Sequence, residues 1–215
     1  MKANVWEFMN EAIDVISSGE HPAARISGDG LLYTAGATRA LAPREGYVAF
    51  TEVQALYFNA LKVMEFISAH FRDEAGARRR QLAAKAVQKA FNKSMWDAHT
   101  HVPVDSYCEG NVDRTPRPMC LWSVALSHPV LIRRRWELLV QEIESALLTP
   151  RGMLAVPQDF PGARKMFPGD SYETARMSGG IWPEFLGAFL VAYAKAFGKS
   201  ALHNEKVEDY VKRLC

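Results

Sequence analysis

Hydrophobic side chains recur at helical spacing along much of this chain. From Val53 to Phe71 the apolar positions fall three or four residues apart, which places them on one face of an α-helix. The same spacing returns over residues 136–147 and 182–197. Weaker patterns predict helices near residues 4–18, 78–96, 117–127 and 204–213. The chain is therefore expected to be almost entirely α-helical, with about seven helices.

Three long connectors separate these helices, at residues 20–47, 97–118 and 149–181, and they are rich in glycine and proline. Loops of this length in a compact domain are more often functional than linkers. Helix pairs that carry long loops on one rim favour an α/α toroid over a four-helix bundle, whose connections are short. We expect one helical domain over residues 1–215, built as an incomplete ring without a substantial β-sheet.

Composition and charge narrow the function classes. Lysine and arginine total 26 and the acids 24, so the net charge of +2 gives no argument for a polyanionic partner. The run Arg78–Arg80 is interpreted as a solvated helix face. The three cysteines, Cys108, Cys120 and Cys215, lack disulfide or zinc spacing, which indicates a reducing compartment. No stretch approaches the roughly 18 apolar residues of a membrane span, so we expect a cytoplasmic protein without nucleic-acid or membrane partners.

Cofactor motifs do not stand out in the sequence. His99 and His101 have H-x-H spacing but no obvious further ligands, so a metal site is not predicted. There is no G-x-S-x-G turn and no glycine-rich phosphate loop. We therefore expect a protein that uses no cofactor.

Three segments, taken in order, carry a family resemblance. The first joins 29–33 (DGLLY) to 51–61 (TEVQALYFNAL). The second joins 117–126 (RPMCLWSVAL) to 147–154 (LLTPRGML), and the third joins 169–172 (GDSY) to 179–189 (GGIWPEFLGAF). Together they resemble the C-terminal domain of glycogen debranching enzymes, the amylo-α-1,6-glucosidase unit.

That resemblance implies an (α/α)6 toroid whose cavity hydrolyses the α-1,6-linked glucose left at a glycogen branch. A complete toroid has twelve helices, so this chain resembles the C-terminal half to two-thirds of the unit. The implied partner is a branched α-glucan such as glycogen. Because a partial ring leaves apolar surface uncovered, we also expect self-association or a partner chain that completes the ring.

Candidate site residues follow from the matched segments. Cleavage with inversion needs two carboxyl groups about 6.5–9.5 Å apart. Glu52 and Glu184 are the candidate catalytic residues, although acids are also favoured where helices begin. For Asp170 a turn-forming role is the alternative to substrate contact. For Trp182 the alternative is packing in the core. The candidate substrate-binding residues are Asp105, Tyr107, Asp170, Tyr172 and Trp182.

The sequence departs from the family where the acid and the base are expected. No counterpart of the family's T-W-M-D-A segment, whose Asp is taken as the general acid, lies between Tyr33 and Glu52. Ile181 occupies the position of the Glu that eukaryotic members use as base, and Met119 and Cys120 replace an Asn–Gln pair. Whether the chain is an enzyme is thus left open, with Glu184 the one residue that could replace the lost base.

Two functions remain in view. The first is a debranching-type glycoside hydrolase that acts on α-1,6-linked glucan. The alternative is a non-catalytic relative that binds glucan or supports assembly. Another toroid enzyme, such as a sugar epimerase, is disfavoured because the six histidines match no such motif.

Overall fold

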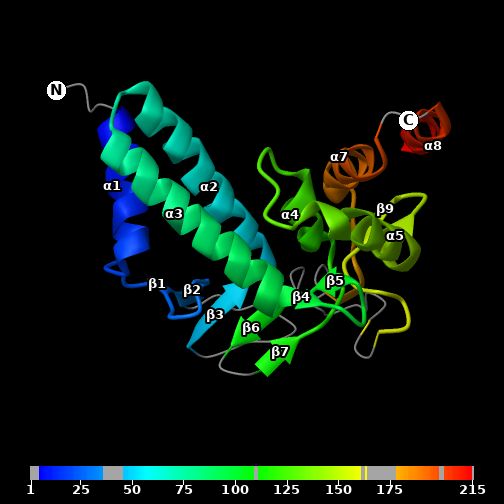
Figure 1. Cartoon of the computed structure of the whole chain (residues 1–215). Helices are drawn as coiled ribbons and strands as arrows, with labels where there is room; N and C mark the ends of the chain where they lie inside the picture. Colours follow the sequence, from blue (N-terminus) through cyan, green and yellow to red (C-terminus); the bar gives the residue numbers. More distant parts are fainter. Residues whose placement is uncertain are drawn as a thin grey trace.

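Helices and short strands alternate in this protein (Figure 1). The computed structural model describes residues 5–35, 46–108, 111–160, 163, 178–198 and 201–214. In that part of the chain there are seven α-helices, together with 3-10 turns at Pro118–Leu121 and Arg133–Arg135 and a π turn at Phe91–Met95. The helices are α1 (Val5–Ser18), α2 (Thr51–His70), α3 (Glu74–Ala90), α4 (Trp122–Ala125), α5 (Trp136–Leu147), α7 (Phe185–Phe197) and α8 (Ala201–Leu214).

Ten strands form three antiparallel sheets in the same described residues. The largest sheet has the order β1-β2-β3-β6-β7, the second β10-β9-β8, and the third pairs β4 with β5. The strands are β1 (Ala24–Ile26), β2 (Leu32–Ala35), β3 (Tyr47–Phe50), β4 (Trp96–Asp97), β5 (Val102–Pro103), β6 (Ser106–Cys108), β7 (Asn111–Asp113), β8 (Leu148–Thr149), β9 (Gly152–Leu154) and β10 (Ile181–Trp182).

These sheets contradict the expected all-α toroid. Most of the strands lie in the three glycine- and proline-rich connectors, where no strand is expected from the sequence pattern. No strand in the described part of the chain is longer than four residues, which is too short for alternation of hydrophobic and polar positions to be recognised. Their pairing is also partly long-range, since Ala49 of β3 lies opposite Tyr107 of β6. The five-stranded sheet therefore joins the first connector to the second.

The long helices form where hydrophobic residues recur at helical spacing. The patterns over residues 53–71 and 136–147 correspond to α2 and α5. Helices α2 and α3 form an antiparallel hairpin with α1 against it, and α4, α5 and α7 lie on the other side of α2 (Figure 1). No helix in the described ranges is both long and apolar enough to cross a membrane.

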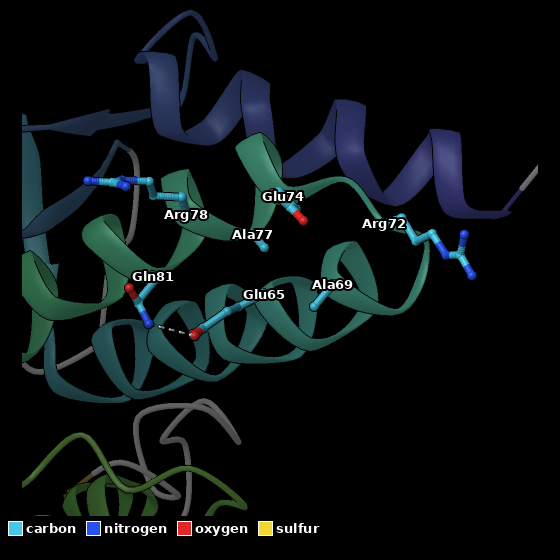
Figure 2. Close-up of a pocket in the computed structure, with 7 residues that line it drawn as sticks. All are labelled: Glu65, Ala69, Arg72, Glu74, Ala77, Arg78 and Gln81. Atoms are coloured by element: carbon cyan, nitrogen blue, oxygen red, sulfur yellow. Dashed lines mark hydrogen bonds between the residues drawn. The ribbon is translucent and has the colours of Figure 1, made fainter.

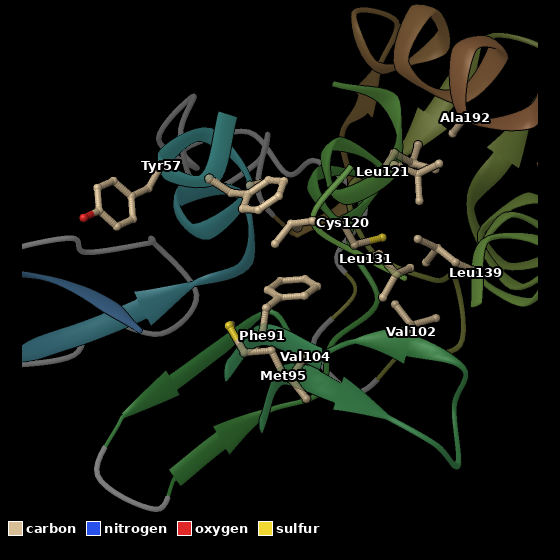
Figure 3. Packing of buried hydrophobic residues seen from close by; sticks show 14 of the residues in the cluster. Tyr57, Phe91, Met95, Val102, Val104, Cys120, Leu121, Leu131, Leu139 and Ala192 are labelled. Atoms are coloured by element: carbon tan, nitrogen blue, oxygen red, sulfur yellow. The ribbon is translucent and has the colours of Figure 1, made fainter. Parts of the chain in front are cut away.

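One hydrophobic cluster connects the two sides of the molecule. Phe91 and Met95 are fully buried at the end of α3, and Leu131 and Leu139 are buried on the other side. Figure 3 shows these side chains gathered around Cys120. The core thus lies between the α2–α3 hairpin and the helices that follow it.

Three amide side chains add a polar connection, which we term the amide clasp and define as Asn59, Gln88 and Asn92. Asn59 donates to the carbonyl of His128 (2.8 Å) and accepts from its N–H (2.9 Å). Gln88 donates to the carbonyl of Pro129 (3.5 Å), and Asn92 donates to that of Val130 (2.8 Å). The α2–α3 hairpin therefore holds the backbone of residues 128–132.

Candidate functional site

The start of α2 is fixed by hydrogen bonds to two strands. The hydroxyl of Thr51 donates to the carbonyl of Val104 (2.5 Å), and the Thr51 N–H donates to the carbonyl of Asp105 (3.2 Å). Gln54 is fully buried; its amide donates to the Leu32 carbonyl (2.6 Å) and accepts from the Leu32 N–H (2.9 Å). The first turn of α2 is thus tied to β2 and to the segment between β5 and β6.

Glu52 lies in this first turn, between the two anchored residues. Its side chain is half-buried, and its Oε2 oxygen is shielded from solvent. Thr51 and Gln54 therefore fix the backbone on either side of Glu52.

A buried ion pair lies close to the same helix start. Arg117 and Asp105 are 3% and 5% exposed, and the Arg117 Nε lies 3.4 Å from an Asp105 oxygen. Arg117 also donates to the carbonyl of Ala155 (3.5 Å). Burying two charges has a large desolvation cost, so such a pair is weak evidence for stability by itself. It does hold Asp105 in one position and connects the second connector to the third.

Cys120 belongs to the same group of residues. Burial raises the pKa of its thiol well above the ordinary value, and the nearby negative charges of Asp105 and Glu52 raise it further. The thiol is therefore neutral at physiological pH. These effects place Glu52 and Asp105 each within electrostatic reach of the Cys120 thiol. We call Glu52, Asp105, Arg117 and Cys120 the carboxylate cluster.

Tyr107 lies in β6, opposite Ala49 of β3, and is half-buried. It contributes slightly to the electrostatic surroundings of Tyr33 in β2. Burial of the Tyr33 phenol and its hydrogen bond to Asp29 (3.0 Å) raise its pKa, so it stays protonated and donates to Asp29. The DGLLY segment thus forms a turn whose aspartate holds a tyrosine on the five-stranded sheet.

The third matched segment forms β10 and the start of α7. Trp182 is only 2% exposed, and its ring lies 5.5 Å from that of Phe185, so it packs in the core. Glu184 is exposed and immediately precedes α7. Asp170 and Tyr172 lie outside the described residues. The roles of all seven candidates in catalysis or substrate binding remain predictions.

Arg117, Gln54 and Cys120 were not among the candidates from sequence. Arg117 stands between Pro116 and Pro118, and nothing in that pattern shows that its guanidinium is buried against Asp105. Gln54 resembles any polar residue in a first helical turn. His99 is exposed, and within the described ranges no three His, Cys, Asp or Glu side chains are grouped so that they could hold a metal ion.

Comparison with known proteins decides the family. A family model described as amylo-alpha-1,6-glucosidase matches residues 6–214. The chain belongs to this family. It is therefore a relative of glycoside hydrolases. A search of curated proteins found no match.

A solved structure titled "Sialidase" shares the fold of this amylo-α-1,6-glucosidase family member. The two agree with a TM-score of 0.75 at 14% sequence identity, over 97% of this chain and 20% of that chain. At this identity the likeness shows the fold alone. This neighbour adds to the strands in contradicting an all-α toroid. The chain spans about a fifth of the length of that solved structure.

Proposed function

We propose that this chain is a debranching-type glycoside hydrolase domain that acts on α-1,6-linked glucan. The observation that carries the proposal is the position of Glu52. It is the acid that matches the family motif, it lies in an anchored helix turn, and, like the buried Asp105, it lies within electrostatic reach of the Cys120 thiol. A fixed, partly desolvated carboxyl group beside other charged groups is typical of glycosidase sites.

In this proposal Glu52 acts as the general acid and Glu184 as the general base of an inverting hydrolysis. The carboxyl of Glu52 donates a proton to the glycosidic oxygen as the bond to the departing glucan breaks. Glu184, exposed at the start of α7, takes a proton from the water that attacks the anomeric carbon. Asp105 is held by Arg117 and orients sugar hydroxyl groups, and Tyr107 provides a second polar contact. Neither step requires a cofactor.

The test is glucose release from a branched limit dextrin. The wild-type chain is compared with Glu52→Gln and Glu184→Gln, and with Glu11→Gln on the exposed face of α1 as a control. We expect slow turnover by the wild type, a loss of about 10²-fold or more in each catalytic variant, and no change in the control. Turnover that survives Glu52→Gln contradicts the proposal.

A second function is favoured by one observation. Ile181 is 40% exposed at the position where eukaryotic family members carry their base, and an isoleucine cannot activate water. A glucan-binding or assembly relative would show no glucose release at all but would be retained on immobilised glycogen. Retention that Glu52→Gln weakens, without turnover in any variant, supports this second function and rejects the first.

A further inference from the structure

Helix α1 has more hydrophobic positions than its packing against the rest of the described chain uses. One set is buried or partly buried against the core and consists of Trp6, Met9, Ile13 and Ile16. A second set recurs at steps of three and four residues and is exposed to solvent: Val5, Phe8 and Ala12. Val5 is 70% exposed and Phe8 is 69% exposed. The second set forms an apolar stripe along the surface of α1.

Helix α2 has a stripe of the same kind. Alternating steps of three and four residues, the spacing by which helices pair along a seam, connect five of its apolar positions: Val53, Leu56, Ala60, Val63 and Ile67. Leu56 is 46% exposed, Val63 is 39% exposed, and Phe66 at the edge of the stripe is 73% exposed. The opposite side of α2 faces α3, where Gln81 donates to Glu65 (3.3 Å), the dashed line in Figure 2.

Helices α1 and α2 lie side by side and run antiparallel. The hydroxyl of Ser17, near the end of α1, lies 2.9 Å from that of Tyr57, in the first half of α2. At the other end of the pair, Trp6 stacks on Phe71 with ring centroids 5.2 Å apart. These contacts define the side of each helix that faces the other.

Both stripes lie on the side away from α3. Arg80 of α3 binds Asp14 of α1 (2.7 Å), which defines the side of α1 that faces α3. At about 100° per residue, the side that faces the neighbouring helix lies between the side that faces α3 and the exposed stripe, on α1 and on α2 alike. The two stripes therefore join into one surface, which we call the α1–α2 face. It consists of Val5, Phe8, Ala12, Val53, Leu56, Ala60, Val63, Phe66 and Ile67.

The α1–α2 face has the apolar area of one side of a protein–protein interface. Aromatic side chains bury about 150–250 Å² each, so Phe8 and Phe66 each expose on the order of 100–150 Å². With Val5, Leu56 and Val63 the exposed apolar area is on the order of 500 Å², and patches of this size usually mark association sites. A standard interface buries roughly 800 Å² per partner, about 60% of it apolar, which is a similar area.

The shape of the face fits a partner that presents two helices. A helix with its side chains is about 10 Å wide, so a single helix would cover the line between α1 and α2 and leave the outer part of both stripes exposed. The α1–α2 face of a second copy has the required width and length. Closed two-fold dimers, in which the same surface of both copies is used, are the commonest oligomers.

The charges at the edges of the face select the orientation of the second copy. Glu7 and Glu11 are exposed along the outer side of α1. Along the outer side of α2, Lys62 binds Glu65 and His70 is exposed, so this edge is nearly neutral at pH 7. Contact between α1 and the α1 of a second copy would bring four glutamates together. Contact between α1 and the α2 of a second copy avoids this repulsion.

We propose that two copies of this chain form a closed dimer through the α1–α2 face, with α1 of each copy on α2 of the other. The two-fold axis then runs parallel to the helices. Neither the dimer nor its orientation depends on the proposed glycosidase activity, because both follow from the exposure, spacing and charge of α1 and α2.

The experiment measures the mass of the full 215-residue chain by light scattering and sedimentation equilibrium across micromolar concentrations. The variants are Phe8→Glu on α1 and Phe66→Glu on α2. The matched control is Leu82→Glu, which changes a side chain that is 57% exposed on α3, outside the face. We expect dimers of the wild type and the control, and a dimer Kd raised about thirtyfold or more in each face variant. All should share one circular dichroism spectrum, because the changed side chains are exposed.

A further variant, Glu11→Lys, tests the orientation. Where α1 lies on the α2 of the second copy, this change leaves the dimer Kd unchanged or slightly raised, since the facing edge is nearly neutral. A lowered Kd would show that α1 lies on α1 and would overturn the proposed arrangement.

Three other results overturn the dimer itself. The first is a wild-type chain that stays monomeric at every concentration. The second is a mass that keeps growing with concentration, because a closed two-fold pair has a fixed mass. The third is equal weakening by Leu82→Glu and Phe66→Glu. Since mass is measured without substrate, each result is independent of whether the chain releases glucose.

Discussion

At the scale of single residues, Gly152 shows how one position controls the geometry around β10. Its φ is +140°, and a Cβ placed on it would lie 2.8 Å from Cγ2 of Ile181 and 3.1 Å from Cα of Pro183. We expect Gly152→Ala to separate β9 from β10 and to lower the free energy of unfolding by about 1–3 kcal/mol. Urea denaturation measures this change.

The matched control for that substitution is Gly187→Ala. Gly187 lies in α7, and a Cβ placed on it meets nothing within 4 Å. Alanine favours the helix over glycine by about 0.5–1 kcal/mol, so this variant should be equally or more stable. Equal stability of Gly152→Ala and the wild type would contradict the steric argument.

Individual site residues were only partly accessible to sequence reasoning. The apolar stripe that begins at Val53 placed Glu52 at the start of a helix, and the structure has it in the first turn of α2. The pairing of Asp105 with Arg117 was not predictable, because it depends on how the chain folds back between them, with β6 paired to β7. For Trp182 the helical pattern alone does not distinguish a side chain in the core from one that stacks against a sugar ring. The structure shows that it is buried.

At the scale of elements, the β4–β5 hairpin depends on one carboxylate. Burial raises the pKa of Asp97, but hydrogen bonds from the N–H groups of His99 (2.8 Å) and Thr100 (3.4 Å), together with Arg114 (3.0 Å), lower it by more in sum. The folded-state pKa therefore lies below the ordinary 3.8. The stabilisation is present above that ordinary value and is lost as the pH falls through the folded-state pKa.

Asp97→Asn should accordingly lower the melting temperature at pH 7, because the charged carboxylate is lost. The difference from the wild type should shrink as the pH falls below the ordinary pKa, where the wild-type carboxylate becomes protonated. Thermal melts followed by circular dichroism across this range measure the effect, with the exposed Asp159→Asn as control. A difference that is constant with pH would show that the charge plays no part.

Elements differ in how far sequence alone can predict them. Long helices such as α2 and α3 carry several turns of repeated pattern, so their presence was clear. The strands are two to four residues long and are stabilised by partners distant in sequence, as in β3 with β6. That dependence on tertiary pairing is why the expectation of an all-α chain was wrong.

At the scale of the whole molecule, the amide clasp joins the α2–α3 hairpin to the segment that leads into α5. Asn92 is its most connected member: it donates to the carbonyls of Gln88 (2.8 Å) and Val130 (2.8 Å). It also accepts from the Ile132 N–H (3.1 Å) and from Arg135 (3.2 Å). Loss of the Asn92 side chain would leave the carbonyls of Gln88 and Val130 and the N–H of Ile132 without this hydrogen-bond partner.

We therefore expect Asn92→Ala to weaken the coupling between the two sides of the molecule as well as its stability. Each buried polar group that loses its partner costs about 1–3 kcal/mol, so the free energy of unfolding should fall by about 2–4 kcal/mol. Cooperative unfolding requires contacts between the α1–α3 side and the side that contains α5 and α7. The amide clasp supplies polar contacts of this kind, next to the hydrophobic core around Phe91. Hydrogen exchange should show α1–α3 and α5–α7 opening at different denaturant concentrations in this variant but together in the wild type. The same single transition in Asn92→Ala as in the exposed control Asn111→Ala would mean that the hydrophobic core alone couples the two sides.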